Sequence, residues 1–178
     1  MRFSSVFVLA SLVATSFATT VDDILNDISV ISTKLNSLDD AITAFPVTGG
    51  SLAKALAIHS NAVSLGTSID KATTDTLAVD PNPVSEADAG ALIAAFEVLE
   101  PVIKHALVGI VDRRPAFTAL PIGGIPALVK QDLNNLSAST IALEDALVSV
   151  TPESAVPEAV ELRNRIDAAF ATAIAAYA

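Results

Sequence analysis

The sequence contains no cysteine and no tryptophan, and aromatic side chains make up only 4% of its 178 residues. Without cysteine, the chain cannot form the disulfides on which small secreted domains often rely. This excludes disulfide-built surface-active proteins and disulfide-bonded helical inhibitors. Packing of apolar side chains must therefore hold the fold together, and 52% of the residues are hydrophobic.

Groups suited to catalysis or metal binding are also scarce. The sequence has two histidines, His59 and His105, and it lacks the G-x-S-x-G, phosphate-loop and H-E-x-x-H motifs. A carboxylate metal site in a helical bundle uses a glutamate three residues before a histidine, and neither histidine has one. We expect Glu100 and Lys104 to form an ordinary i, i+4 ion pair on the solvent side of a helix. The sequence thus predicts no catalytic residue, no metal site and no cofactor.

The first 18 residues have the three parts of a secretory signal peptide. Arg2 supplies the positive charge, residues 6–13 form the apolar core, and Ser16-Phe17-Ala18 is a small-x-small cleavage site. The apolar stretch is shorter than the roughly 20 residues that cross a bilayer, so we expect cleavage rather than a transmembrane segment. The remaining residues 19–178 are predicted to be secreted, into the extracellular space or the cell wall.

The predicted mature chain is strongly acidic. Nine basic and twenty acidic residues remain after cleavage, which gives a net charge of −11. This sign disfavours nucleic acid and anionic membrane surfaces as partners. A chain of about 160 residues is long enough for one hydrophobic core, so we expect a single domain.

Apolar residues recur at alternating spacings of three and four along most of the chain, which is the period of an amphipathic helix. Thr20 and Ser85 are suited to cap the first and third helical stretches, and acidic residues follow both in the first turn. No pattern typical of a β-strand competes with the helical one. The predicted helical stretches cover residues 20–45, 51–77, 85–110, 128–150 and 160–177.

Prolines and glycines separate the helical stretches. Pro81-Asn82-Pro83 and residues 121–126 are predicted connectors. Pro101 lies within the third stretch and is expected either to kink that helix or to divide it. The dibasic pair Arg113-Arg114, which Pro115 follows, is interpreted as the end of this helix rather than as a processing site. The predicted fold is all-α, an antiparallel up-and-down bundle of four to five long amphipathic helices.

The alanine-rich apolar stripes favour binding of apolar matter. Where such helices pack incompletely they leave narrow cavities, and a bundle core is a common place for a ligand pocket. The same composition also fits a tightly packed core or exposed apolar patches. His59 either finds a hydrogen-bond partner in the core or meets the head group of a bound amphiphile. The candidate ligand-facing residues, all assigned to inner helix faces, are Ile28, Leu35, Leu56, His59, Val63, Leu92, Phe96, Leu136 and Phe170.

Three segments beyond the signal peptide occur in a characteristic order and spacing. They are Val21-Asp22-Asp23-Ile24-Leu25, then Ala106-Leu107-Val108 leading to Asp112-Arg113-Arg114-Pro115-Ala116-Phe117, and Ile166-Asp167-Ala168-Ala169-Phe170-Ala171-Thr172-Ala173-Ile174. With these segments the chain resembles the fungal hydrophobic surface binding proteins, also called cell wall galactomannoproteins. The resemblance extends over nearly the whole mature chain.

The resemblance implies a secreted or wall-held helical bundle that adsorbs to hydrophobic surfaces and helps to recruit lipolytic enzymes to them. It also implies binding of long-chain fatty acids between the helices, as in some members of the family. Because the chain ends at Ala178 without a serine- and threonine-rich tail, we expect a soluble secreted form. The alternative is a structural or antigenic cell wall mannoprotein without a specific lipid ligand. Its sugar would be carried at Asn135, in the sequon Asn135-Leu136-Ser137, if this asparagine is exposed.

Overall fold

The computed structural model describes residues 19–178, so the predicted signal peptide lies outside the described residues. This part of the chain forms six helices and no regular strand. The prediction of an all-α bundle is confirmed. The helices are α1 (Val21–Thr43), α2 (Leu52–Leu77), α3 (Glu86–Asp112), α4 (Arg114–Thr118), α5 (Ile125–Val150) and α6 (Val156–Ala176).

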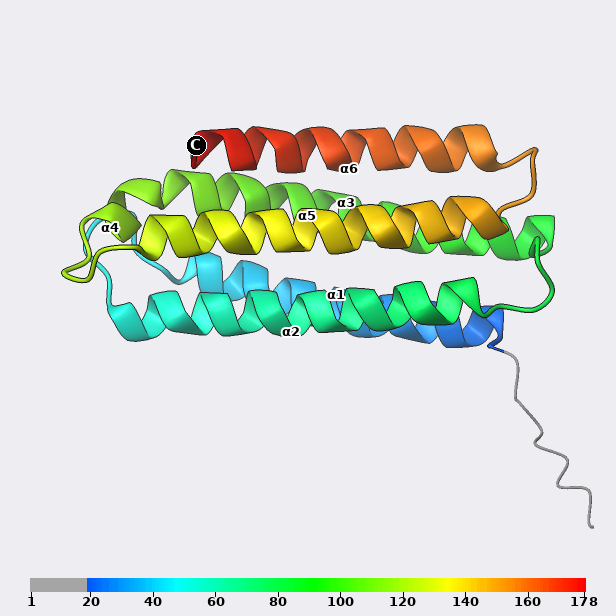
Figure 1. Ribbon diagram of the computed structural model, residues 1–178, viewed down its shortest axis with the longest axis horizontal. Coiled ribbons are helices and arrows are strands. Elements are labelled where there is room, and N and C mark those ends of the chain that lie inside the picture. Colours follow the sequence, from blue (N-terminus) through cyan, green and yellow to red (C-terminus); the bar gives the residue numbers. More distant parts are fainter. Residues whose placement is uncertain (1–18) are drawn as a thin grey trace, which may run out of the picture.

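The five long helices lie side by side along one direction (Figure 1), and their contacts form a closed ring around one core. In this ring α1 contacts α2 and α3, α2 contacts α5, and α6 contacts both α5 and α3. Consecutive long helices run in opposite directions, as in an up-and-down bundle (Figure 1). Because five is an odd number, the directions cannot alternate around the whole ring. At least one neighbouring pair must be parallel, and in this ring three are, namely α2 with α5, α1 with α3, and α3 with α6.

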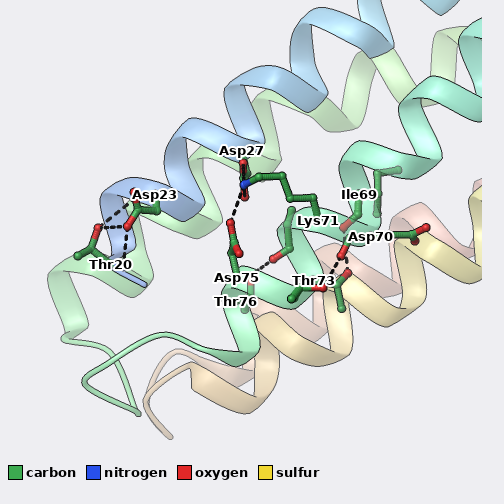
Figure 2. A network of polar contacts seen from close by, with 11 residues as sticks. Thr20, Asp23, Asp27, Ile69, Asp70, Lys71, Thr73, Asp75 and Thr76 are labelled. Carbon is green, nitrogen blue, oxygen red and sulfur yellow. Dashed lines mark hydrogen bonds and ion pairs between the residues drawn. The ribbon is translucent and has the colours of Figure 1, made fainter. Parts of the chain in front are cut away.

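The two predicted N-caps are confirmed. The Thr20 hydroxyl accepts a hydrogen bond from the Asp23 amide at 3.3 Å, and the Asp23 carboxylate accepts one from the Thr20 amide at 2.9 Å (Figure 2). Ser85 accepts from the amide of Asp88 at 3.1 Å. These bonds satisfy amides in the first turn that have no partner within the helix. The start of α1 and the start of α3 are thus encoded locally.

Two helices begin earlier than the periodicity predicted, because their prolines lie in the first turn. The start of α5 is Ile125 rather than residue 128, and that of α6 is Val156 rather than residue 160. A proline in the first turn removes no hydrogen bond, because amides there have no partner within the helix. The same rule explains α4, a short helix with Pro115 near its start that the pattern did not predict.

Pro101 does not divide α3. The helix is continuous from Glu86 to Asp112, and the proline lies on its exposed side. Water can reach backbone groups there that lose a partner because proline has no amide hydrogen. Of the two alternatives for this stretch, the single helix is therefore correct.

An ion cluster joins α1 to α2 (Figure 2). The Lys71 ammonium lies 2.7 and 2.8 Å from the two carboxylate oxygens of Asp27, and 2.6 Å from the carboxylate of Asp75. Asp27 is buried, and burial disfavours a charged carboxylate unless it is paired. The hydrogen bond from Lys71 also lowers the pKa of Asp75. The cluster thus allows an acidic residue on the inner side of α1.

Arg113 connects the end of α3 to the end of α1. Its Nε and Nη2 donate to the carbonyls of Phe45 and Thr43 at 2.8 and 3.0 Å, and its Nη1 donates to the carbonyl of Gly109 at 3.0 Å. Carbonyls at the end of a helix lack partners within it, so Arg113 caps α1 from a neighbouring helix. These bonds support the structural interpretation of the dibasic pair.

We expect the substitution Gly50→Ala to destabilise the loop between α1 and α2. Gly50 has a φ of +114°, and a Cβ there would lie 2.6 Å from Cζ of Phe45. Phe45 is fully buried and stacks on Phe117 with ring centroids 4.4 Å apart, so its ring has little room to move. Strain and clash together should lower the free energy of unfolding by about 2–4 kcal/mol, measured by urea denaturation.

The matched control is Gly49→Ala. Gly49 also has a positive φ, +77°, but a Cβ there would meet nothing within 4 Å. Only the backbone strain remains, so the loss should be about 1–2 kcal/mol. Equal losses for the two substitutions would show that the contact with Phe45 does not matter.

Candidate functional site

Three apolar cavities follow one another along the axis of the bundle. We call them the Glu144 cavity, the central cavity and the His59 cavity, and their volumes are about 30, 60 and 50 Å³. Phe96 lines both the Glu144 cavity and the central cavity. Leu136 lines both the central cavity and the His59 cavity. Phe96 is the one lining residue that the first two cavities share, whereas the central and His59 cavities also share Leu38, Ala106 and Leu107.

Every long helix contributes to the wall of the central cavity, and Thr140 is its one polar residue. Of the predicted ligand-facing residues, Leu92 lines the Glu144 cavity and His59 lines the His59 cavity. Ile28 is buried in the core but lines none of the three cavities. Four other predicted residues meet around the central cavity: Leu35, Phe96, Leu136 and Phe170.

The placement of Leu56 and Val63 on an inner helix face was wrong. These side chains are 45% and 53% exposed. Each follows a buried alanine by one residue, which turns it about 100° away around the helix. The small residues face inward because they let α2 approach its neighbours closely, whereas the prediction gave more weight to large side chains. The buried stripe of α2 is Ala55, Ile58, Ala62, Leu65, Ile69, Ala72 and Thr76.

His59 has a partner within the chain. Its Nδ1 lies 2.9 Å from both carboxylate oxygens of Asp132 on α5. Burial raises the pKa of Asp132, and the hydrogen bond from His59 opposes that rise. Both residues line the His59 cavity, so one end of the row of cavities carries a polar pair. Of the two alternatives for His59, the structure thus shows the first, a hydrogen-bond partner within the protein, which is Asp132.

Glu144 is a polar residue of the cavities that the sequence analysis missed. It lies on α5, is 5% exposed and lines the Glu144 cavity. Both of its carboxylate oxygens are buried without a hydrogen-bond partner among the described residues. Burial raises the pKa of Glu144 to about 8, and the nearby negative charge of Asp167 adds to this rise. The end of the row opposite His59 therefore carries an unpaired acid that holds its proton at neutral pH.

The predicted pair of Glu100 and Lys104 exists, with Nζ 2.5 Å from Oε1, but Glu100 does not face open solvent. Its side chain is 14% exposed and also binds Arg165 of α6 through two hydrogen bonds of 2.9 Å. The hydrogen bonds from Arg165 and Lys104 lower the pKa of Glu100 to about 2. The cluster therefore ties α3 to α6.

Two open grooves lie on the outside of the bundle. The groove between α3 and α6 has a volume of about 570 Å³ and is lined largely by alanine, valine and leucine. Leu107 forms part of this groove and also lines the central cavity, so one side chain separates the interior from the outside. The groove between α2 and α5, of about 400 Å³, includes Val63 and the exposed Asn135 of the sequon.

The two histidines do not share a site. His59 pairs with Asp132, whereas His105 lies on α3 with its Nδ1 2.7 Å from Asp39 of α1. Within residues 19–178, no group of three or more histidine, aspartate or glutamate side chains is placed to hold a metal ion. None of the helices in this range is long and apolar enough to span a bilayer.

Comparison with known proteins identifies close structural relatives. The family described as hydrophobic surface binding protein A matches residues 21–149. The crystal structure of AFMP4P in complex with palmitic acid has a TM-score of 0.81 and 32% sequence identity, and the match covers 89% of this chain and 99% of that one. Ligand binding domain 1 of the Penicillium marneffei MP1 protein, complexed with arachidonic acids, has a TM-score of 0.78 and 16% identity, over 89% and 99% of the two chains. Domain 2 of the same protein, also with arachidonic acids, has a TM-score of 0.72 and 18% identity, over 88% and 91%. No curated protein sequence matches the chain significantly.

Proposed function

Since the chain belongs to the hydrophobic surface binding protein A family, we propose that it is a secreted, non-enzymatic protein that binds long-chain fatty acids between its helices. The observation that carries this proposal is the row of three apolar cavities along the bundle axis. The relative AFMP4P, which forms a complex with palmitic acid, supports it. The predicted signal peptide supports secretion.

The cavities need to widen before they can hold a fatty acid. The largest has a volume of about 60 Å³, whereas pockets for ligands of this kind usually measure about 300–1,000 Å³. We propose that the tail enters from the groove between α3 and α6, where displacement of Leu107 opens the central cavity. The ligand then merges the cavities by moving side chains that line two of them at once, among them Phe96 and Leu136.

The outer surface supports a second activity, adsorption to hydrophobic surfaces. Val98 and Val108 of α3 are 68% and 62% exposed, and Val108 borders the alanine-lined groove along α6. Exposed apolar side chains beside an apolar groove favour contact with an apolar surface. Once adsorbed, the protein would present its acidic exterior to the secreted lipolytic enzymes that we propose it helps to recruit.

Exposure of Asn135 supports glycosylation, which also belongs to the alternative function as a structural wall mannoprotein. The alternative predicts a mass shift on enzymatic deglycosylation and recovery from the wall fraction without bound lipid. A protein that shows the mass shift and also carries fatty acid would be glycosylated at Asn135 and still have the proposed lipid-binding function.

Lipid extraction tests the main proposal. Protein secreted by its own host and purified without detergent should release long-chain fatty acids to organic solvent, identified by mass spectrometry. Leu136→Phe should reduce the amount recovered, because the larger side chain fills space between the central and His59 cavities. Leu56→Phe makes the same substitution at an exposed position and should leave the amount unchanged.

Recovery of no lipid, together with no retention of the protein on alkyl-coated beads at moderate salt, would rule out both activities. Equal lipid recovery from the two phenylalanine variants would place the ligand outside the cavities. Circular dichroism of both variants checks that each remains helical.

A further inference from the structure

Glu144 is the one acid in the row of cavities that has no partner among the described residues. The other buried acids, Asp27 and Asp132, contact Lys71 and His59. The Glu144 side chain lines an apolar cavity, and neither of its oxygens accepts or donates a hydrogen bond within residues 19–178. Polar groups are rarely buried without a hydrogen-bond partner in folded proteins, because burial removes the hydrogen bonds that they make with water in the unfolded chain. The position is therefore suited to a polar group from a ligand.

The charged groups near Glu144 come from α5 and α6. Burial contributes most to its raised pKa of about 8, Asp167 and Asp145 raise it further, and Arg163 lowers it. Arg163 is held by Asp145 at 2.5 Å and by Asp167 at 3.5 Å, so its charge is already shared. At neutral pH Glu144 is thus an uncharged acid, with one oxygen that donates and one that accepts. From α3 the cavity receives only apolar side chains, Leu92, Ile93 and Phe96.

We propose that Glu144 holds the carboxyl head group of the bound fatty acid, while the tail passes Phe96 into the central cavity. The inference rests on the proposed function and adds the orientation of the ligand. It places the head group at the end of the row formed by the start of α3, the end of α5 and the start of α6.

The chemistry of a second carboxyl matches both oxygens of Glu144 at once. Two protonated carboxyls form a cyclic pair of hydrogen bonds, in which each group donates once and accepts once. When one of them is ionised, the remaining proton is shared between them, as in the carboxyl pairs of some enzymes. A hydroxyl head group would engage one oxygen at a time, and an ammonium group would bring a second positive charge beside Arg163, which also lines this cavity. A fatty acid is therefore the ligand class that the geometry favours.

The test compares palmitic acid with methyl palmitate, which has the same tail but cannot donate a proton. Binding to the delipidated full chain is measured by displacement of an apolar fluorescent probe at pH 6 and pH 10. Wild-type protein should prefer the acid at pH 6 by about tenfold, as expected for one additional hydrogen bond, because the ester can accept from Glu144 but cannot donate to it. At pH 10 both carboxyls are ionised and repel each other, so the preference should disappear.

Variants at Glu144 separate the head-group contact from the tail contact. Glu144→Leu should bind methyl palmitate at least as tightly as wild type and should lose the preference for the acid. Glu144→Gln, whose amide both donates and accepts, should keep most of the preference. Glu97→Leu makes the same change at an exposed position next to Phe96 in the chain and serves as the control.

Two results would overturn the head-group proposal while leaving the proposed function intact. One is retention of the acid preference by Glu144→Leu. The other is loss of the preference in Asp132→Leu instead, which would place the head group at the His59 cavity. If wild-type protein binds neither palmitic acid nor its ester and yields no lipid on extraction, both proposals fail.

Discussion

Replacing Glu144 with leucine is expected to raise the free energy of unfolding at pH 8 by up to about 4 kcal/mol. The glutamate is buried in an apolar cavity without a partner among the described residues, and leucine is apolar and of similar size. Most single substitutions destabilise a protein, so a large gain at a core position would be unusual. It is expected here because the substitution removes a buried polar group rather than a contact.

The gain depends on pH in a direction that follows from the pKa of Glu144. In the folded protein this carboxyl keeps its proton up to about pH 8, whereas in the unfolded chain it loses the proton near the ordinary value of 4.5. Between these values the folded state binds more protons than the unfolded state, so wild-type stability falls as the pH rises. Below pH 4.5 the carboxyl is protonated in both states and the titration contributes nothing. The difference between variant and wild type should therefore grow from pH 4.5 to pH 8 and then level off.

Urea denaturation across this pH range measures the effect. The pKa of Asp132 is also raised by burial, so the wild-type profile alone does not isolate Glu144, but the difference profile does. Glu144→Gln is the matched control, because it removes the titration and keeps a polar group in the cavity. It should flatten the pH dependence with a smaller gain in stability than leucine. A parallel shift of the leucine variant at every pH would show that Glu144 is ionised in the folded protein near pH 7.

Local signals in the sequence predicted the helices well. The spacing of apolar residues located all five long helices, and the caps at Thr20 and Ser85 set two of their starts. The errors at the starts of α5 and α6 arose because Pro126 was assigned to a connector and the last predicted stretch began only after Pro157. Proline does end helices, but the first turn is the position that tolerates it, and single-sequence periodicity does not distinguish the two uses.

The inner face of α2 was harder to predict than its existence. Alanine and threonine make up much of its buried stripe, and their small apolar surfaces give a weak periodic signal. Leu56 and Val63 form a stronger apolar signal one step around the helix, although both are exposed. Which face is buried depends on the positions of α1 and α5, and these are long-range contacts.

The buried acids left a detectable signal. Asp27, Asp132 and Glu144 each lie directly beside a residue of the apolar stripe, at positions where a charge is unexpected. A charged residue within such a stripe is exposed at its edge, paired with another helix, or buried without a partner. Asp27 is paired with Lys71, 44 residues away, and Asp132 with His59, 73 residues away. Periodicity carries no information about such distant partners, so it does not distinguish these two acids from Glu144.

We expect Phe96→Ala to lower the stability of the lipid-free protein by about 3–5 kcal/mol and to strengthen its response to palmitic acid. Phe96 is 5% exposed and forms the wall between the Glu144 and central cavities. Its removal merges these cavities and leaves apolar space that the lipid tail can fill. A ligand that binds only the folded state stabilises it by an amount that grows with the logarithm of its concentration over its Kd, so part of the lost stability should return when palmitic acid is added.

Phe117→Ala is the control that makes this result specific. Phe117 is 1% exposed and stacks on Phe45, but it lines none of the three cavities. Its loss should cost a similar free energy, because a buried aromatic side chain is removed in both variants. Calorimetry with and without palmitic acid should then show a larger increase in the unfolding midpoint for Phe96→Ala than for Phe117→Ala or wild type. Equal increases in all three proteins would mean that the tail does not pass through the space beside Phe96. In that case fatty acid would bind elsewhere, either in the His59 cavity at the other end of the row or in the groove between α3 and α6.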